Sequence, residues 1–450
     1  MTVAAPRAER SRDVALAVVR DVFGAVHRAA QAAFDYRSGR AHLDERERAF
    51  AAELSYGSIK MRRAIDWYLQ PYLGKRFTTI PPTILEILRL GAYQLIFMHG
   101  VAARAAVHES VSLARAYGHR GTAGLVNAVL RRLSESPMTA PTPPQFESPH
   151  EYLGTLHSFP SWIVSRFAER FPQIELDLML AALNARPQLG VRVNTMRLTV
   201  DAATAELEAL GAMVTRSIFV KDALLIEGPL TASALERTAA GRWSVQSESS
   251  CMPVDVLDPQ PGETILDLCS GRGHKTLHIA ARTNMAAKIV AVDSEERKIA
   301  HAQHALEEAG AAGVAFVRGD AAAAALELPA ADAVLLDAPC SGSGILGRHP
   351  EARWRKGPAD AERLSELQGR LLAAAAARLR PGGRIVYSVC AVEAVENEGV
   401  IDRFLEANPA FMRDDPPQRY APYLRGGALL VPPGLERRDG FFIARLHRDS

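Results

Sequence analysis

Residues 266–276 read LDLCSGRGHKT, an apolar run that leads into a glycine-containing loop and then into a helical pattern. Glycines at such a junction let the backbone approach a ligand closely, and the N-terminus of the following helix attracts negative charge. The stretch is therefore typical of the first strand–loop–helix unit of a parallel α/β sheet that binds a nucleotide-like ligand.

Strand and helix patterns alternate regularly from Glu263 onward. Such alternation predicts a doubly wound parallel sheet with right-handed crossovers, which binds its ligands beyond the carboxyl ends of the strands. Two apolar runs near the end of the chain predict a pair of antiparallel strands. We expect strands at 264–269, 288–293, 315–318, 333–337 and 383–390, helices near 275–282, 295–309 and 360–379, and the terminal strands at 428–431 and 440–446.

The sequence before this α/β region differs in pattern. Residues 8 to about 134 repeat apolar positions at three- and four-residue spacing, with helices predicted at 106–117 and 121–134 and a helix start at Pro81–Thr83. A Pro/Ser/Thr-rich stretch then predicts a linker. Next come predicted helices at 160–171, 175–184 and 200–211 and strands at 189–194 and 223–227. We predict an all-α bundle at 1–136, a linker at 137–149, a small α+β subdomain at 150–250 and the α/β domain at 251–450.

Charge is distributed unevenly along the chain. Residues 1–140 hold 20 Lys and Arg against 12 Asp and Glu, whereas the remainder holds 33 against 39. A basic bundle suggests a polyanionic partner such as RNA. No apolar run approaches the roughly 18–20 residues of a membrane helix, and the N-terminus lacks a signal-peptide pattern, so we expect a cytoplasmic protein. The four cysteines form no CxxC pair, which argues against a metal site and a disulfide framework.

Acidic residues follow two of the predicted strands. Asp293 ends the second strand, where a carboxylate can accept both hydroxyls of a ribose, and Asp320 follows the third, where an acid can meet an adenine amino group. The loop contains Gly-x-Gly but lacks the third glycine of the dinucleotide fingerprint, which disfavours NAD. The terminal antiparallel strands favour a methyltransferase, and so the nucleoside cofactor we expect is S-adenosylmethionine.

Cys340 and Cys390 each stand at or just past the carboxyl end of a predicted strand. A single cysteine there is more often a small buried apolar residue. If the fourth and fifth strands are neighbours, about 5 Å apart, both thiols open onto the cofactor side beside Asp337 and opposite Lys275. Carbon 5 of a pyrimidine is a poor nucleophile, and a thiolate that adds to C6 activates it. The paired cysteines therefore favour methylation of cytosine C5.

Motifs over most of the chain resemble the NOL1/NOP2/Sun family of RNA cytosine-C5 methyltransferases. They include Asp337–Gly342, Arg348–Glu351 with Trp354, Cys390 with Glu396–Glu398, Val191–Thr195 and the final strand Asp439–Leu446. Glu53–Gly57 and Asn127–Leu133 look like parts of a NusB-type RNA-binding bundle. The resemblance implies a Rossmann-like class I methyltransferase domain behind a NusB-like bundle and a small RNA-binding subdomain. It also implies methylation of small-subunit (16S) rRNA, and we expect a monomer with no metal and no membrane attachment.

Site residues follow from the same resemblance. Cys390 becomes the nucleophile, Cys340 the cysteine that assists product release, and Lys275 and Asp337 their active-site partners. The cofactor-binding residues that the resemblance implies are Cys269, Ser270, Gly271, Arg272, Gly273, His274, Lys275, Asp293, Asp320 and Asp337.

The cofactor loop departs from the family pattern Asp-x-Cys-Ala-Ala-Pro-Gly-Gly-Lys-Thr. Arg272 replaces the proline, which fixes φ, and His274 replaces the second glycine, which can adopt a conformation strained for histidine. Gly271 is new and could restore the flexibility, and Val389 replaces a threonine beside Cys390. Two alternatives therefore stay open: a methyltransferase for another acceptor, or a non-catalytic RNA-binding or assembly factor.

Overall fold

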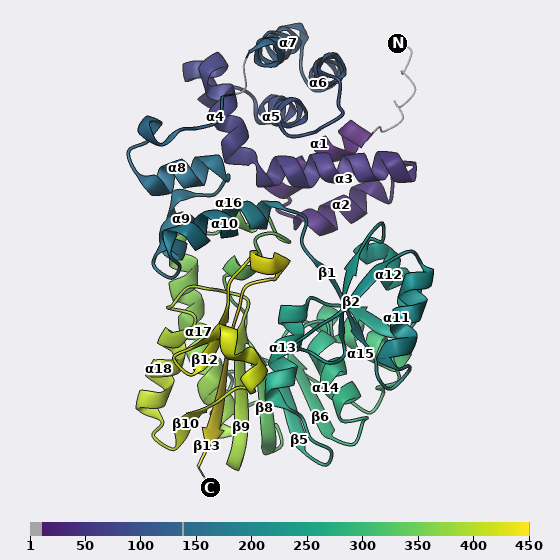
Figure 1. Cartoon of the computed structure of the whole chain (residues 1–450), viewed down its shortest axis with the longest axis vertical. Coiled ribbons are helices and arrows are strands. Elements are labelled where there is room, and N and C mark those ends of the chain that lie inside the picture. The colour runs from purple at the N-terminus through teal and green to yellow at the C-terminus, as the bar shows by residue number, and fades with distance from the viewer. Residues whose placement is uncertain (1–10, 137–138, 450) are drawn as a thin grey trace. The chain divides into compact units, whose positions relative to one another are not determined.

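The computed structural model describes residues 11–136 and 139–449 (Figure 1). They form two compact units. The first runs to Asn184 and also takes in Arg348–Arg355, and the second comprises Ala185–Gly347 and the chain from Lys356 onward. The sequence-based domain boundaries remain a prediction, and the observed division after Asn184 places residues 150–184 with the N-terminal helices.

Helices make up the first unit, as the apolar spacing predicted. The Asp44 carboxylate caps α3 by accepting from the Glu47 amide at 2.7 Å, and Pro82 occupies the first turn of α5. Apolar side chains from α1 to α7 form one buried core. The helices are α1 (Ser11–Phe23), α2 (Ala30–Ser38), α3 (Glu45–Lys60), α4 (Arg62–Leu73), α5 (Pro82–Ile96), α6 (Ala103–Tyr117), α7 (Arg120–Glu135), α8 (Pro149–Leu156), α9 (Ser161–Ala168) and α10 (Gln173–Asn184).

The segment Arg348–Arg355, which includes α16 (Ala352–Arg355), belongs to this helical unit although it follows β8 of the α/β domain in the chain. Arg353 is fully buried and donates to Asn184 Oδ1 at 2.7 Å and to the Leu183 carbonyl at 3.0 Å. Trp354 Nε1 donates to the Ile59 carbonyl at 2.7 Å. The helical unit is therefore completed by residues that lie far along the chain, which no local pattern predicted.

The expected linker is partly structured. Residues 137 and 138 lie outside the described residues. A short 3-10 turn forms at Pro143–Gln145, and α8 begins at Pro149, where the Ser148 side chain accepts from the Glu151 amide at 3.1 Å.

A small four-stranded antiparallel sheet opens the second unit, with strand order β2-β3-β1-β4. The predicted strands correspond to β1 (Leu189–Val193) and β3 (Ala223–Glu227), while the edge strands β2 (Met213–Arg216) and β4 (Trp243–Val245) were not predicted. Helices α11 (Val200–Ala209) and α12 (Ala232–Ala239) belong to this subdomain. Of the three helices expected between 150 and 250, only 200–211 therefore lies beside this sheet.

A nine-stranded sheet follows, ordered β11-β12-β13-β9-β8-β5-β6-β7, with β10 paired to β13. Its five parallel strands confirm the predicted alternation. The chain moves outward from β5 to β7 and then returns to place β8 beside β5, so the switch point lies at the ends of β5 and β8. The strands are β5 (Thr264–Leu268), β6 (Lys288–Asp293), β7 (Ala315–Arg318), β8 (Ala331–Asp337), β9 (Leu379–Val389), β10 (Phe411–Asp414), β11 (Leu424–Arg425), β12 (Ala428–Val431) and β13 (Phe441–Arg448).

Helices cover both faces of this sheet (Figure 1). Side chains alternate along each strand: Ile265 faces the core under one set of helices, and Leu266 faces the core under the other. The first set is α13 (Glu248–Leu257), α14 (His274–Arg282) and α15 (Glu296–Glu308), and the second is α17 (Pro358–Ala377) and α18 (Glu398–Ala407). In residues 11–136 and 139–449, no helix is long and apolar enough to cross a bilayer.

Candidate active site

The loop between β5 and α14 lies at the switch point of the sheet and turns sharply. Cys269, Gly271 and Gly273 have φ angles of 63°, 58° and 78°, in the left-handed region that glycine enters without steric cost. The Ser270 amide donates to the Val292 carbonyl at 2.8 Å, which fastens the loop to the end of β6. The loop backbone therefore lies against the carboxyl ends of β5 and β6.

The two loop glycines meet different surroundings. A Cβ at Gly273 would lie 2.9 Å from Ala302 Cβ and 2.9 Å from Leu306 Cδ1, both on α15. A Cβ at Gly271 would meet nothing nearer than the Cys269 carbonyl oxygen at 4.0 Å. Gly273 thus allows α15 to approach the loop closely, whereas Gly271 borders open space into which a ligand could fit.

Two of the departures from the family pattern, Arg272 and His274, have ordinary backbone. Neither Arg272 nor His274 has a positive φ. His274 is the first residue of α14, and both side chains are exposed. The strain that the sequence suggested for His274 is therefore not present, and Gly271 takes the left-handed conformation in this loop.

Asp293 and Asp320 stand at neighbouring strand ends, as predicted. Asp293 Oδ2 accepts from the Gly271 amide at 2.9 Å, and Oδ1 accepts from the Glu295 amide at 2.8 Å. Each carboxylate oxygen keeps a second lone pair for a further donor. Asp320 is exposed beyond β7, and its Oδ1 accepts from the Ala322 amide at 2.9 Å.

Lys275, in the first turn of α14, forms an ion pair with Asp337, the last residue of β8. Lys275 Nζ lies 2.6 Å from Asp337 Oδ2, and Ser388 Oγ donates to Asp337 Oδ1 at 2.8 Å. Burial alone would lower the pKa of Lys275, but the Asp337 carboxylate and the nearby Cys390 outweigh it and raise that pKa. Lys275 is therefore a cation at neutral pH, held in place by the first turn of α14.

The two cysteines predicted to meet do so. Strands β8 and β9 pair in parallel with Asp337 opposite Ser388, and Cys340 Sγ lies 3.2 Å from Cys390 Sγ. The hydrogen bond with Cys390 and burial raise the pKa of Cys340 well above its ordinary value. The raised pKa keeps Cys340 a protonated thiol, which can donate to Cys390 Sγ.

A buried acid that sequence reasoning did not assign anchors the loop that carries Cys340. Glu396 Oε1 accepts from the Ser341 amide at 2.8 Å and from Gln368 Nε2 at 2.9 Å. Burial raises the pKa of Glu396 to about 7. Ser388 and Gln368 were also missed, and only the parallel register opposite Asp337 could have pointed to Ser388.

The remaining cysteines have structural positions. Cys251 is fully buried, and burial raises its pKa. Burial and the surrounding acids raise the pKa of Cys269 to about 12. Within the described ranges, no three His, Cys, Asp or Glu side chains gather as metal ligands.

The doubly wound sheet, its antiparallel edge strands and the glycine loop at the switch point define the fold of class I methyltransferases. Family models match the chain in three places: 16S rRNA methyltransferase RsmB/F over residues 254–447, the NusB family over 9–135, and an RsmF/B-like ferredoxin-like domain over 159–233. These matches confirm the fold class that the sequence predicted for all three parts.

Relatives and solved structures agree with these matches. The chain is 31% identical over 414 residues to the probable ribosomal RNA small subunit methyltransferase B of Bacillus subtilis, covering 90% of this chain and 92% of that one. It is 32% identical to the corresponding Synechocystis protein, with the same coverage. The crystal structure of PH0851 superposes with a TM-score of 0.82 at 26% identity over all of both chains. The chain belongs to the RsmB family of small-subunit rRNA methyltransferases.

Proposed function

We propose that the protein transfers a methyl group from S-adenosylmethionine to C5 of a cytosine in 16S rRNA, through a covalent bond between Cys390 Sγ and C6 of the base. The observation that carries this proposal is the pair of thiols 3.2 Å apart, at adjoining strand ends beside the Lys275–Asp337 ion pair. Methylation of an exocyclic amine would need no thiol.

The methyl donor fits the residues at the switch point. Asp293 can accept from ribose hydroxyls, Asp320 can meet the adenine amino group, and Ser270 Oγ is buried without a partner among the described residues. Gly271 leaves open space beside the loop. When bound, S-adenosylmethionine would supply an electrophilic methyl group on a sulfonium centre.

Side chains of this protein then divide the chemistry. The Cys390 thiolate adds to C6, and the electron pair displaced from the C5=C6 bond makes C5 nucleophilic toward the methyl group. Lys275 holds Asp337 through their ion pair, and Asp337 can accept from the cytosine amino edge and balance charge as the ring is activated. The C5 proton then passes to water, its electron pair re-forms the C5=C6 bond, and the C6–S bond breaks to release Cys390 as a thiolate. Cys340 assists this release by donating a hydrogen bond to the departing Cys390 Sγ.

Two variants test the assignment. Cys340→Ala should trap a covalent RNA adduct because release is impaired, whereas Cys390→Ala should give neither adduct nor product. Cys251→Ala, at a buried cysteine outside the site, is the matched control and should retain turnover. The readout is a labelled protein–RNA band that persists in denaturing electrophoresis after incubation with labelled 16S rRNA. An adduct that survives Cys390→Ala would reverse the roles of the two cysteines.

Two alternatives have separate outcomes. A non-catalytic RNA-binding factor would bind no S-adenosylmethionine in calorimetric titration, and the ordinary backbone of Arg272 and His274 removes the strain argument in its favour. A methyltransferase for another acceptor would bind the cofactor but leave no label on total rRNA. Label at cytosine C5 in 16S rRNA supports the proposal, and its absence from all RNA overturns it.

A further inference from the structure

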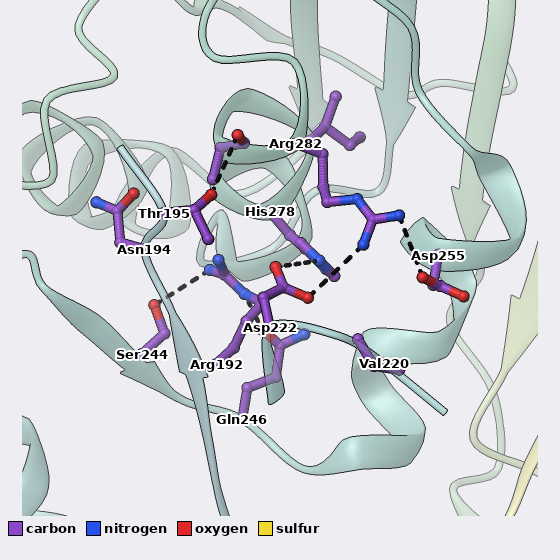
Figure 2. A network of polar contacts seen from close by, with 12 residues as sticks. Arg192, Asn194, Thr195, Val220, Asp222, Ser244, Gln246, Asp255, His278 and Arg282 are labelled. Carbon is purple, nitrogen blue, oxygen red and sulfur yellow. Dashed lines mark hydrogen bonds and ion pairs between the residues drawn. The ribbon is translucent and has the colours of Figure 1, made fainter. Parts of the chain in front are cut away.

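The end of β1 and the segment that follows it are hydrogen-bonded to the two helices that border the cofactor loop. Figure 2 shows Arg192, from this stretch, close to Asp222 and His278. Two contacts reach α14: Arg192 contacts its start, and Thr195 Oγ1 donates at 3.4 Å to the carbonyl of Ala281, near the end of this helix. A third reaches α15, where Asn194 Nδ2 donates at 2.9 Å to the carbonyl of Ala309, just past the helix. The small sheet is therefore hydrogen-bonded to both helices that follow the cofactor strands.

Arg192 is a fully buried charge in this contact. Its Nε donates to Gln246 Oε1 at 2.9 Å, and its Nη2 donates to Ser244 Oγ at 3.2 Å and to the His274 carbonyl at 3.3 Å. A backbone carbonyl has two lone pairs, so the Arg192 contact adds to the helical hydrogen bond of His274 without replacing it. Gln246 and Ser244 aim the guanidinium, and the guanidinium holds the first turn of α14.

Asp222, the residue before β3 in the small sheet, forms ion pairs with two side chains of α14. His278 Nε2 lies 3.0 Å from Asp222 Oδ2, and Arg282 Nη1 lies 3.8 Å from Asp222 Oδ1. Burial alone would raise the pKa of Asp222, but His278, Arg192 and Arg282 outweigh it and lower that pKa. Figure 2 shows these side chains converging between the sheet and α14. Burial lowers the pKa of Arg192, and the Asp222 carboxylate offsets part of that effect.

The position of α15 completes the arrangement. Two side chains hold the C-terminal end of α15. Asn194 Nδ2 donates to the Ala309 carbonyl, and Arg197 Nε donates to the same carbonyl at 3.2 Å. The same helix places Ala302 against Gly273, where an added Cβ would lie 2.9 Å from Ala302 Cβ and force a shift of its neighbours. The loop that ends at Gly273 is therefore confined on one side by α15 and on the other by the first turn of α14.

We infer that Arg192 is a positioning residue for the methyl-donor loop: it fixes the His274 turn, and through it the Cys269–Gly273 backbone, from the small sheet. This inference rests on the proposed function of the same loop. It requires that the small sheet sets cofactor affinity without touching the cofactor. Removing Arg192 should therefore weaken binding of S-adenosylmethionine by about tenfold, the effect of one charge-assisted hydrogen bond.

The test compares Arg192→Met with Arg192→Lys, which keeps the charge but cannot form the fork of contacts. Arg216→Met is the matched control, since Arg216 is an exposed arginine of the same sheet that pairs with Asp201. Calorimetric titration of the folded protein with S-adenosylmethionine measures affinity, and hydrogen exchange measures protection of amides 270–278. We expect weaker affinity and faster exchange for Met, an intermediate effect for Lys, and wild-type values for the control.

The outcomes test the inference about Arg192 and the proposed function separately. A merely structural Arg192 would lower the melting temperature but leave affinity and local exchange in the folded protein unchanged, and that result would overturn the inference. If Arg192→Met fails to fold, wild-type affinity in Arg192→Lys overturns it instead. If the wild type binds no S-adenosylmethionine, the proposed function fails, and exchange at 270–278 alone then decides whether Arg192 holds the turn.

Discussion

Adding one methyl group at each loop glycine separates two roles of the loop backbone. At Gly273, alanine would meet left-handed backbone, which costs about 1–2 kcal/mol, and contacts of 2.9 Å with Ala302 and Leu306. Overpacking of this kind costs about 1–3 kcal/mol more. At Gly271 the backbone is also left-handed, but the new Cβ would meet only open space. Gly273→Ala should therefore destabilise the protein by about 2–5 kcal/mol and Gly271→Ala by about 1–2 kcal/mol.

Denaturant unfolding of both variants at one pH measures the difference, and the entropy change of the unfolded chain is common to both and cancels. Calorimetric titration with S-adenosylmethionine supplies the second axis, because a methyl group at Gly271 would occupy the space proposed for the cofactor. Gly271→Ala should thus lose more affinity per unit of lost stability. Equal destabilisation by the two substitutions would refute the close approach of α15 as the reason for Gly273.

Three further changes test other parts of the site. Burial raises the pKa of Glu396 from 4.5 to about 7, so its folded form binds more protons than the unfolded chain between these values and stability is lost as pH rises through them. Unfolding titrations should show wild-type stability relative to Glu396→Gln falling by about 3 kcal/mol from about pH 4 to about pH 8; a constant difference would contradict this. Ser388→Ala removes one partner of Asp337 and should lower kcat about fivefold at unchanged KM for RNA, and a change confined to KM would contradict a role in aligning Asp337. Cys251→Ala should cost about 1 kcal/mol in unfolding free energy and leave kcat unchanged, whereas lost turnover would indicate a catalytic role.

Local patterns predicted the parts of the fold whose signal is local. Strands β6, β7 and β12 begin and end at the predicted residues, because apolar runs there are bounded by charged or turn residues. Strand β2 was missed because Met213–Arg216 is mostly exposed and forms no apolar run, and β4 was missed because three residues are too few to establish a period. The burial of Arg353 was beyond prediction, since its partners at Leu183 and Asn184 lie far away in the chain.

The candidate site divides in the same way. The meeting of Cys340 and Cys390 followed from the order of parallel strands, which fixes neighbours at a sheet edge. Glu396 and Arg192 contact backbone groups of segments that are distant in the chain. Every residue has a backbone carbonyl, so the residue type at the contacted position gives no sign of such a contact. Sequence reasoning placed both residues in stretches that resemble the family but could not assign either a positioning role.

The altered loop can be reconciled with a competent site through its backbone. Two successive glycines of the family pattern correspond to Gly273 and His274, and only Gly273 has a positive φ and a contact that excludes a Cβ. His274 is the first residue of α14 and does not have a positive φ, so a side chain at this position meets no backbone strain. Arg272 likewise occupies ordinary backbone and points its side chain to solvent. The substitutions therefore fall where the backbone accepts them, and the glycine that the packing of α15 requires is the one that was kept.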